Sequence, residues 1–106
     1  MNDILQVYTT VPSQEQANDL ARRLIEGRHA ACVQVLGPLQ STYRWQGQVE
    51  QAQEWLLAAK TTAEAYPALE EAIRQSHPYA VPEILAAPVT AGNPAYLAWV
   101  RQEVSV

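Results

Sequence analysis

The spacing of hydrophobic and polar residues changes along the chain, and each change marks an expected element. A short apolar run from Ile4 to Thr10, ended by Pro12, predicts a central strand. Ser13 then suits a helix N-cap with Gln16 at the capping-box spacing, and Gly27 suits the C′ position. Between them, one helix face is apolar: Ala17, Leu20, Ala21, Leu24 and Ile25.

The segment from Ala30 to Thr61 predicts two long β-strands joined at Gln46-Gly47. Gly47 permits the positive φ that a tight two-residue turn requires. Strands commonly run about 5–6 residues, so each arm is about twice the usual length. Gly37-Pro38 interrupts the first arm, and we expect a bulge or an edge position there because proline cannot donate to a central ladder. An isolated ribbon is marginally stable in water, so a second copy of the chain is expected to cover it.

The second half of the chain predicts a helix, a strand and a helix. Thr62–Ser76 is expected to be helical, with Pro67 in its first turn. Ile84–Val89 has the apolar character of a buried strand, and Asn93-Pro94 begins a helix that extends to about Glu103. The order β-α-β-β-α-β plus a helix predicts an α+β chain of the ferredoxin-like kind, with two helices on one face of an antiparallel sheet.

Composition narrows the classes of function. The 106 residues predict one domain, 1–106, and a net charge of −4 with seven scattered Lys and Arg disfavours a nucleic-acid partner. No apolar run approaches the ~20 residues that cross a bilayer, so no membrane partner is expected. The first residues show no signal-peptide pattern and Cys32 is the single cysteine, which together predict a cytoplasmic protein.

No recognised catalytic motif is present. The chain has no nucleophile elbow, no phosphate-binding glycine loop and no His-Glu-x-x-His. The turn at 10–13 also lacks the arginine that an acyl-phosphate hydrolase of this fold would need. We therefore expect a protein that is not an enzyme.

Two side chains are candidate metal ligands. The imidazole of His77 suits copper, nickel or zinc, although a lone histidine here can instead donate to a backbone carbonyl. The thiol of Cys32 suits Cu(I) or Zn, although a free cysteine is more often a small buried hydrophobe. Strand alternation groups Cys32 with Gln34 and Leu36, which leaves its direction open.

Charged and aromatic residues suggest a cleft and an interface. Lys60 ends a wholly apolar stretch, and it either reaches solvent or lies in a polar pocket between chains. The other expected members of that pocket are Glu54, Tyr79 and Glu83. Tyr43, Trp45 and Trp55 could stack on a ligand, but aromatics are enriched in interface cores, and we assign them to contacts between copies.

Short motifs run through nearly the whole chain in a fixed order. They are Ala30-Ala31-Cys32-Val33, Tyr43-x-Trp45-x-Gly47, Lys60-Thr61, His77-Pro78-Tyr79, Val81-Pro82-Glu83-Ile84, and Pro88-Val89-Thr90-x-Gly92-Asn93-x-x-Tyr96-Leu97-x-Trp99. Together they resemble the CutA family, whose members are linked to divalent-cation tolerance. The resemblance implies a ferredoxin-like subunit whose long hairpins build a homotrimer similar to the PII signalling proteins.

The resemblance also implies two functions for a cleft between subunits. The first is binding of copper or another divalent cation. Some members are described as holding copper through a cysteine at the end of the first strand and a His-His pair, where this chain has Thr9 and Ser76-His77, so only His77 matches. The alternative is a PII-like signalling or scaffold trimer that binds a partner protein or a small anionic effector, with Lys60 as the counter-charge.

Overall fold

The computed structural model describes residues 3–104, and its elements follow the predicted chain order. The strands are β1 (Ile4–Val11), β2 (Cys32–Trp45), β3 (Gln48–Thr62) and β4 (Leu85–Pro88). The helices are α1 (Gln14–Glu26), α2 (Tyr66–Ser76) and α3 (Pro94–Glu103). The α+β class predicted from the sequence is confirmed.

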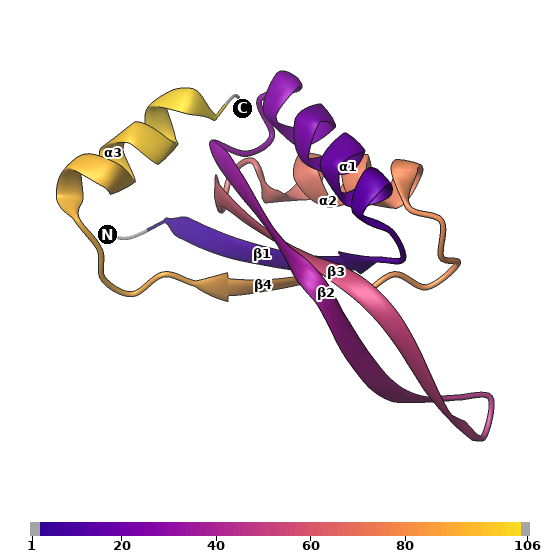
Figure 1. Cartoon of the computed structure of the whole chain (residues 1–106). Coiled ribbons are helices and arrows are strands. Elements are labelled where there is room, and N and C mark those ends of the chain that lie inside the picture. Colours follow the sequence, from indigo (N-terminus) through magenta and orange to yellow (C-terminus); the bar gives the residue numbers. More distant parts are fainter. Residues whose placement is uncertain (1–2, 105–106) are drawn as a thin grey trace.

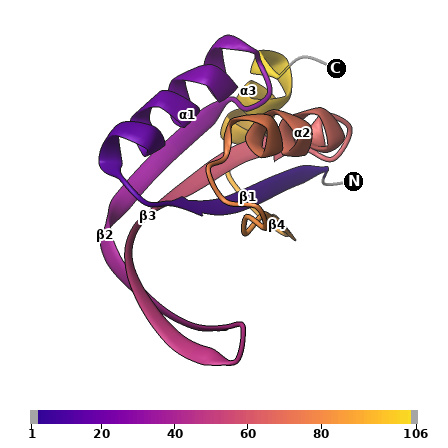
Figure 2. The same cartoon turned by 90° about the vertical axis from the view of Figure 1, so that its right-hand side faces the viewer.

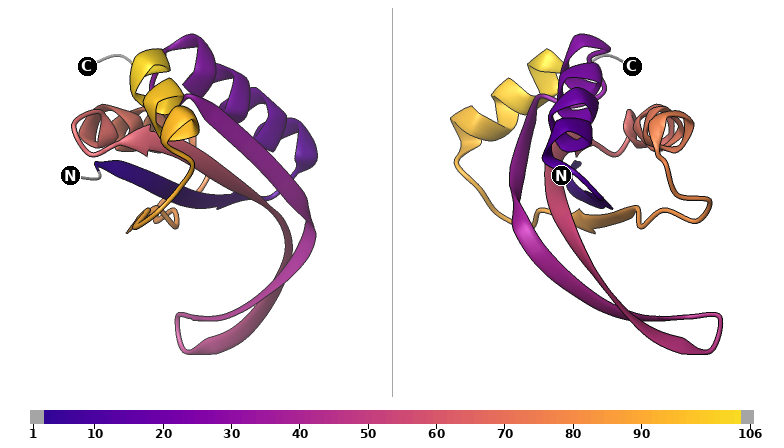
Figure 3. Two further views of the ribbon diagram at one scale, coloured as in Figure 1. Left: turned by 90° about the vertical axis from the view of Figure 1, so that its left-hand side faces the viewer. Right: turned by 45° about the vertical axis from the view of Figure 1, so that its right-hand side comes forward.

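One antiparallel sheet holds the strands in the order β2-β3-β1-β4. The two central strands, β1 and β3, pair from Ile4↔Thr62 to Val11↔Trp55. Helices α1 and α2 lie side by side over one face of the sheet (Figures 1 and 2). Helix α3 stands apart from them, at the end of the sheet where β1 begins (Figures 1 and 3).

The main core lies between the sheet and the pair α1 and α2. Alternate residues of β1 and β3 point toward these helices, and burial of their apolar surface is worth about 25 cal/mol per Å². The buried members are Val7, Val11, Ala17, Leu20, Leu24, Ala30, Leu57, Ala59, Leu69 and Ile73. A second cluster joins α3 to the sheet through Ile4, Ala65, Val100 and Val104. The apolar face of α1 was predicted apart from Ile25, which is 40% exposed because Leu24 takes the core side of α1.

The long hairpin forms as predicted and projects past the rest of the chain (Figures 1 and 2). Its turn residues Gln46 and Gly47 have φ values of 50° and 81°, the left-handed geometry of a tight hairpin turn. The expected irregularity lies at Gly37-Pro38, where the pairing passes from Leu36↔Leu56 to Leu39↔Glu54. β2 therefore holds one extra residue at this point, and the extra residue keeps Leu36 and Leu39 on the same face.

Three boundaries differ from the prediction. The helix expected from Thr62 begins at Tyr66, because Thr62 still pairs with Ile4 and its Oγ1 accepts a 3.2 Å hydrogen bond from the Ala65 amide. The strand expected over 84–89 is shorter, and all of Leu85–Pro88 is exposed because β4 is an edge strand without helix cover. At the end of α1, Arg28 and not Gly27 adopts positive φ, at 60°.

We predict that Gly37→Ala destabilises the fold. A Cβ atom at Gly37 would overlap the indole ring of Trp55, and overpacking of this kind costs about 1–3 kcal/mol. Urea unfolding should show this loss in the native background. In a Trp55→Leu background the same substitution should cost much less, and an equal cost in both backgrounds would contradict the packing explanation.

Candidate functional site

One face of the sheet lacks the cover of α1 and α2, and we call it the open sheet face. Residues paired across strands share a face, so the pairs Gln6↔Lys60, Tyr8↔Ala58 and Leu36↔Leu56 place their side chains together here. Cys32, Gln34, Leu85 and Ala87 belong to the same face by their pairing. Leu36 is 55% exposed and Leu85 is 60% exposed. The open sheet face therefore presents apolar side chains to solvent.

Lys60 lies at one end of the open sheet face in a small polar group. Its Nζ donates a hydrogen bond to Oε1 of Gln34, and Cys32 is its direct cross-strand neighbour. Burial, aided by the nearby Cys32, raises the pKa of Tyr96. Tyr96 and Gln34 were not predicted as members of this group. Gln34 could have been found from strand alternation, but nothing in the sequence places Tyr96 of α3 beside β2.

His77 links the loop after α2 to the end of β1. Its Nε2 lies 2.8 Å from the Thr10 carbonyl oxygen, and the Tyr79 amide donates to its Nδ1 over 3.1 Å. This arrangement fits a neutral ring whose proton is on Nε2, and burial lowers the pKa of His77. Both ring nitrogens are therefore engaged with the backbone, and a metal ion at His77 would have to displace one of these bonds.

Glu54 is a nearly buried carboxylate beside this loop. The Tyr79 hydroxyl donates a 2.9 Å hydrogen bond to this carboxylate, and Glu54 as a whole is only 6% exposed. Burial, together with the Glu54 carboxylate, raises the pKa of Tyr79 to about 12. Within residues 3–104, no lysine or arginine forms an ion pair with Glu54.

A concave pocket of about 690 Å³ opens between the hairpin and the loop 78–83, and we call it the hairpin pocket. β2 contributes Tyr43 and Trp45 to its lining, and β3 contributes Glu54. The loop contributes Tyr79 and Glu83. The described residues that line it include two carboxylates and three aromatic rings but neither lysine nor arginine.

The predicted cleft is divided in two within one chain. Glu54, Tyr79 and Glu83 come together in the hairpin pocket, as grouped from the sequence. Lys60 lies six positions farther along β3, which is about 20 Å at the rise of a strand, and Cys32 is with Lys60. Trp55, which was assigned to a subunit interface, is partly buried and packs against the main core on the helix side.

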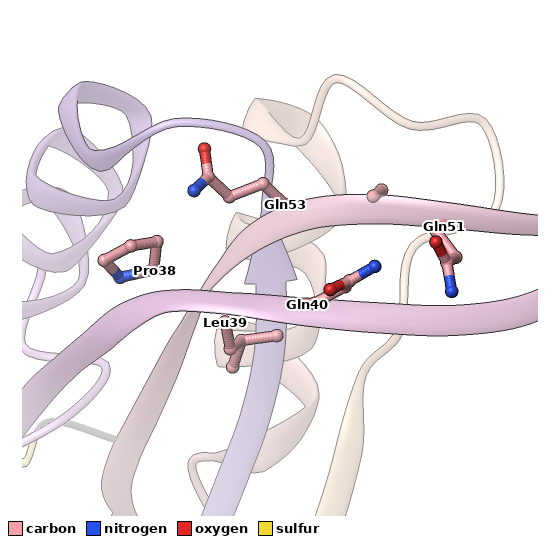
Figure 4. A pocket seen from close by; sticks show the side chains of 6 residues that line it. Pro38, Leu39, Gln40, Gln51 and Gln53 are labelled. Carbon is pink, nitrogen blue, oxygen red and sulfur yellow. The ribbon is translucent and has the colours of Figure 1, made fainter.

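A second hollow, of about 410 Å³, lies along the hairpin itself (Figure 4). Pro38 and Leu39 line it together with Gln40, Gln51 and Gln53, so its polar groups are uncharged amides. The residues from 3 to 104 contain no cluster of three or more His, Cys, Asp or Glu side chains placed to hold a metal ion. In the same range, no helix is long and apolar enough to cross a membrane.

The sequence and the fold are both similar to those of known proteins of one family. The profile of the CutA1 divalent ion tolerance protein matches residues 5–103. A divalent-cation tolerance protein CutA of Thermus thermophilus is 51% identical over 96 residues, covering 91% of this chain and 93% of the relative. The mouse Protein CutA is 43% identical over 95 residues, covering 90% of this chain and 54% of the mouse protein, so the chain spans about half of that longer relative. A solved Thermus thermophilus Cut A1 structure superposes with a TM-score of 0.94 at 48% identity, covering 96% and 99% of the two chains.

We predict that His77 makes stability fall as the pH is lowered from about 6.5. Because the folded pKa is depressed below the unfolded value, the unfolded chain binds more protons in this window, and its proton uptake favours unfolding. Urea unfolding from pH 7 to 5 should show this slope, and His77→Gln should reduce it. His29→Gln is the matched control and should keep the slope. An unchanged slope in His77→Gln would contradict the prediction.

Proposed function

Because the chain belongs to the CutA1 family of divalent ion tolerance proteins, we propose that it acts in divalent-cation tolerance as a PII-like homotrimer of ferredoxin-like subunits. The proposal assigns the protein to the cytoplasm and gives it no catalytic step. The observation that carries the homotrimer is the open sheet face, which exposes apolar side chains that a monomer would leave in water.

The hairpin supports the same assembly. Tyr43 is 44% exposed, Trp45 48% and Val49 66%, and all lie toward the tip of a ribbon that projects from the sheet. Large aromatic side chains are enriched at the centres of protein interfaces, and a projecting ribbon gains stability when another copy covers it. In this arrangement Tyr43 and Trp45 contact a neighbouring copy, while Trp55 supports the hairpin from inside its own subunit.

The cation site is proposed to lie between copies, with copper as one candidate ion. Among residues 3–104 of a single copy, His77 and Cys32 lie at separate places and no cluster of three or more potential ligands is present, so the proposal takes further ligands from a neighbouring copy. Some family members are described as having copper ligands at two further positions, which hold Thr9 and Ser76 in this chain. These two residues contribute little to a metal site. Thr9 is 2% exposed, and the Ser76 hydroxyl donates to the Ala72 carbonyl over 3.2 Å.

A second candidate function is binding of a small effector, as in a PII-like signalling protein. The hairpin pocket favours this alternative, because its 690 Å³ is in the range of small-molecule sites and its aromatic lining suits an organic ligand. Lys60, the expected counter-charge for an anionic effector, does not line the hairpin pocket. An anion would therefore bind at the polar group around Lys60 and Gln34.

We predict that Leu36→Asp dissociates the trimer. Light scattering after size exclusion should give about three times the 11.8 kDa chain mass for the native protein and one chain mass for the variant. The reason is that an unpaired charge would be buried between the open sheet faces. Ile25→Asp, at an exposed position on α1, is the control and should leave the mass unchanged. A native protein that elutes as a monomer would refute the homotrimer.

We predict that the trimer binds Cu²⁺ or Zn²⁺ and that binding weakens as the pH falls through the pKa of His77, which burial holds below the usual value for histidine. Calorimetric titration of each metal salt should show heat for the native protein, a loss in His77→Ala and a reduction in Cys32→Ser. His29→Ala is the control for adventitious imidazole binding. Absence of heat with every metal salt would remove metal binding by this protein from the proposal.

A further inference from the structure

We propose that Lys60 of each copy forms an ion pair with Glu54 of a neighbouring copy and so completes the hairpin pocket in the trimer. The inference deepens the proposed homotrimer and rests on it, because it names the charged contact between copies. It also gives the pocket an occupant other than the small effector considered above. The support comes from the faces on which the two charges lie and from the partners of every other described cation.

Glu54 is the buried half of the proposed pair. A glutamate that is only 6% exposed is seldom left without a counter-charge, because its carboxylate has lost most of its hydration. Its one hydrogen bond to a side chain among the described residues comes from the neutral hydroxyl of Tyr79, at 2.9 Å. Glu83 lines the same pocket, so a positive charge that enters it meets a negative potential.

Lys60 is the other half. Its Nζ donates to the neutral amide oxygen of Gln34, and no carboxylate of the described residues forms an ion pair with it. Its pairing with Gln6 places it on the open sheet face, which the proposed assembly covers. An ammonium group has three donors, and one amide oxygen satisfies one of them. Once this face is covered, Lys60 therefore requires a carboxylate from a neighbouring copy.

Glu54 and Lys60 belong to the same face of the sheet. Alternate residues of a strand share a face, and the two positions on β3 differ by six. Leu39, the cross-strand partner of Glu54, also stays on the face of Leu36 beyond the irregularity in β2. The six positions correspond to about 20 Å along the strand, so the two charges cannot meet within one copy. In a closed ring, each copy can offer Lys60 to one neighbour and Glu54 to the other, which gives equivalent pairs at every interface.

The other described cations have partners or face away. Arg28 donates to two backbone carbonyls at the end of α3. Arg44 forms no ion pair among the described residues, but its partner Val49 is an odd-numbered position of β3, so Arg44 lies on the opposite face of the hairpin from Glu54. Lys60, the only lysine of the chain, is the cation that remains. The remaining arginines form ion pairs within their own copy: Arg22, Arg23, Arg74 and Arg101.

Carbodiimide cross-linking of the native protein tests the contact directly. The reagent joins an amine to a carboxylate without a spacer, and Lys60 carries the only side-chain amine. Cross-linked dimers and trimers should therefore appear on a denaturing gel, and peptide mass mapping should show Lys60 joined to Glu54. Glu54→Gln should remove this link, whereas Glu64→Gln, at an exposed position outside the pocket, should keep it. A link from Lys60 to a different carboxylate, with none to Glu54, would overturn the proposal.

A double-mutant cycle measures the coupling between the two charges. Light scattering over a range of protein concentrations, at a fixed concentration of urea, gives the midpoint at which the trimer dissociates. Glu54→Gln and Lys60→Met should each raise this midpoint at least about tenfold, because each leaves the opposite charge buried and unpaired. The double variant should raise it no further than one single variant does. Glu64→Gln should leave the midpoint unchanged. A double variant whose change equals the product of the two single changes would contradict the pair.

The same measurements separate this pair from the proposed function. A native protein that is a monomer would refute the homotrimer and the ion pair together. A native trimer whose midpoint is unchanged in Lys60→Met would retain the homotrimer and overturn the ion pair. A trimer that Arg44→Met weakens while Lys60→Met does not would also overturn it, because a different cation would then meet Glu54.

Discussion

The pairing of β3 with both β1 and β2 is the constraint on which the rest of this structure depends. Because β3 is hydrogen-bonded on both sides, the register of each pair fixes which side chains share a face. One face of the sheet packs against α1 and α2 and forms the core. The other is the open sheet face, which is largely apolar. β3 is also longer than β1, and its pairing with β1 stops at Trp55. Glu54, the next residue, therefore emerges where the loop after α2 passes.

That position explains the chemistry of the hairpin pocket. His77 joins the loop to the end of β1 through the Thr10 carbonyl, and Tyr79 follows closely enough to donate to Glu54. The two bonds hold the loop against the sheet, and the loop forms one wall of the pocket. The projecting hairpin forms the other wall through Tyr43 and Trp45. A carboxylate, a neutral imidazole and three aromatic rings therefore meet at the point where the sheet narrows to a two-stranded ribbon.

The proposed assembly and the hairpin pocket share the hairpin. The proposed trimer uses the open sheet face and the hairpin, and the same hairpin shapes the pocket. A neighbouring copy that contacts Tyr43 or Trp45 would therefore change access to Glu54 as well. Lys60 and Cys32 of the same copy lie about 20 Å away along β3. The family relationship supports a role in divalent-cation tolerance.

The sequence by itself determined the local elements, because their signals lie within a few residues of each other. The apolar face of α1, the Gln46-Gly47 turn and the irregularity at Gly37-Pro38 were all predicted from spacing and backbone chemistry. Only the tertiary structure decided which distant side chains meet. Tyr79 contacts Glu54, which is 25 positions away in the sequence, and His77 contacts Thr10, which is 67 positions away. Lys60 takes part in neither contact. Strand register and the path of a loop set these contacts, and neither is written in local periodicity.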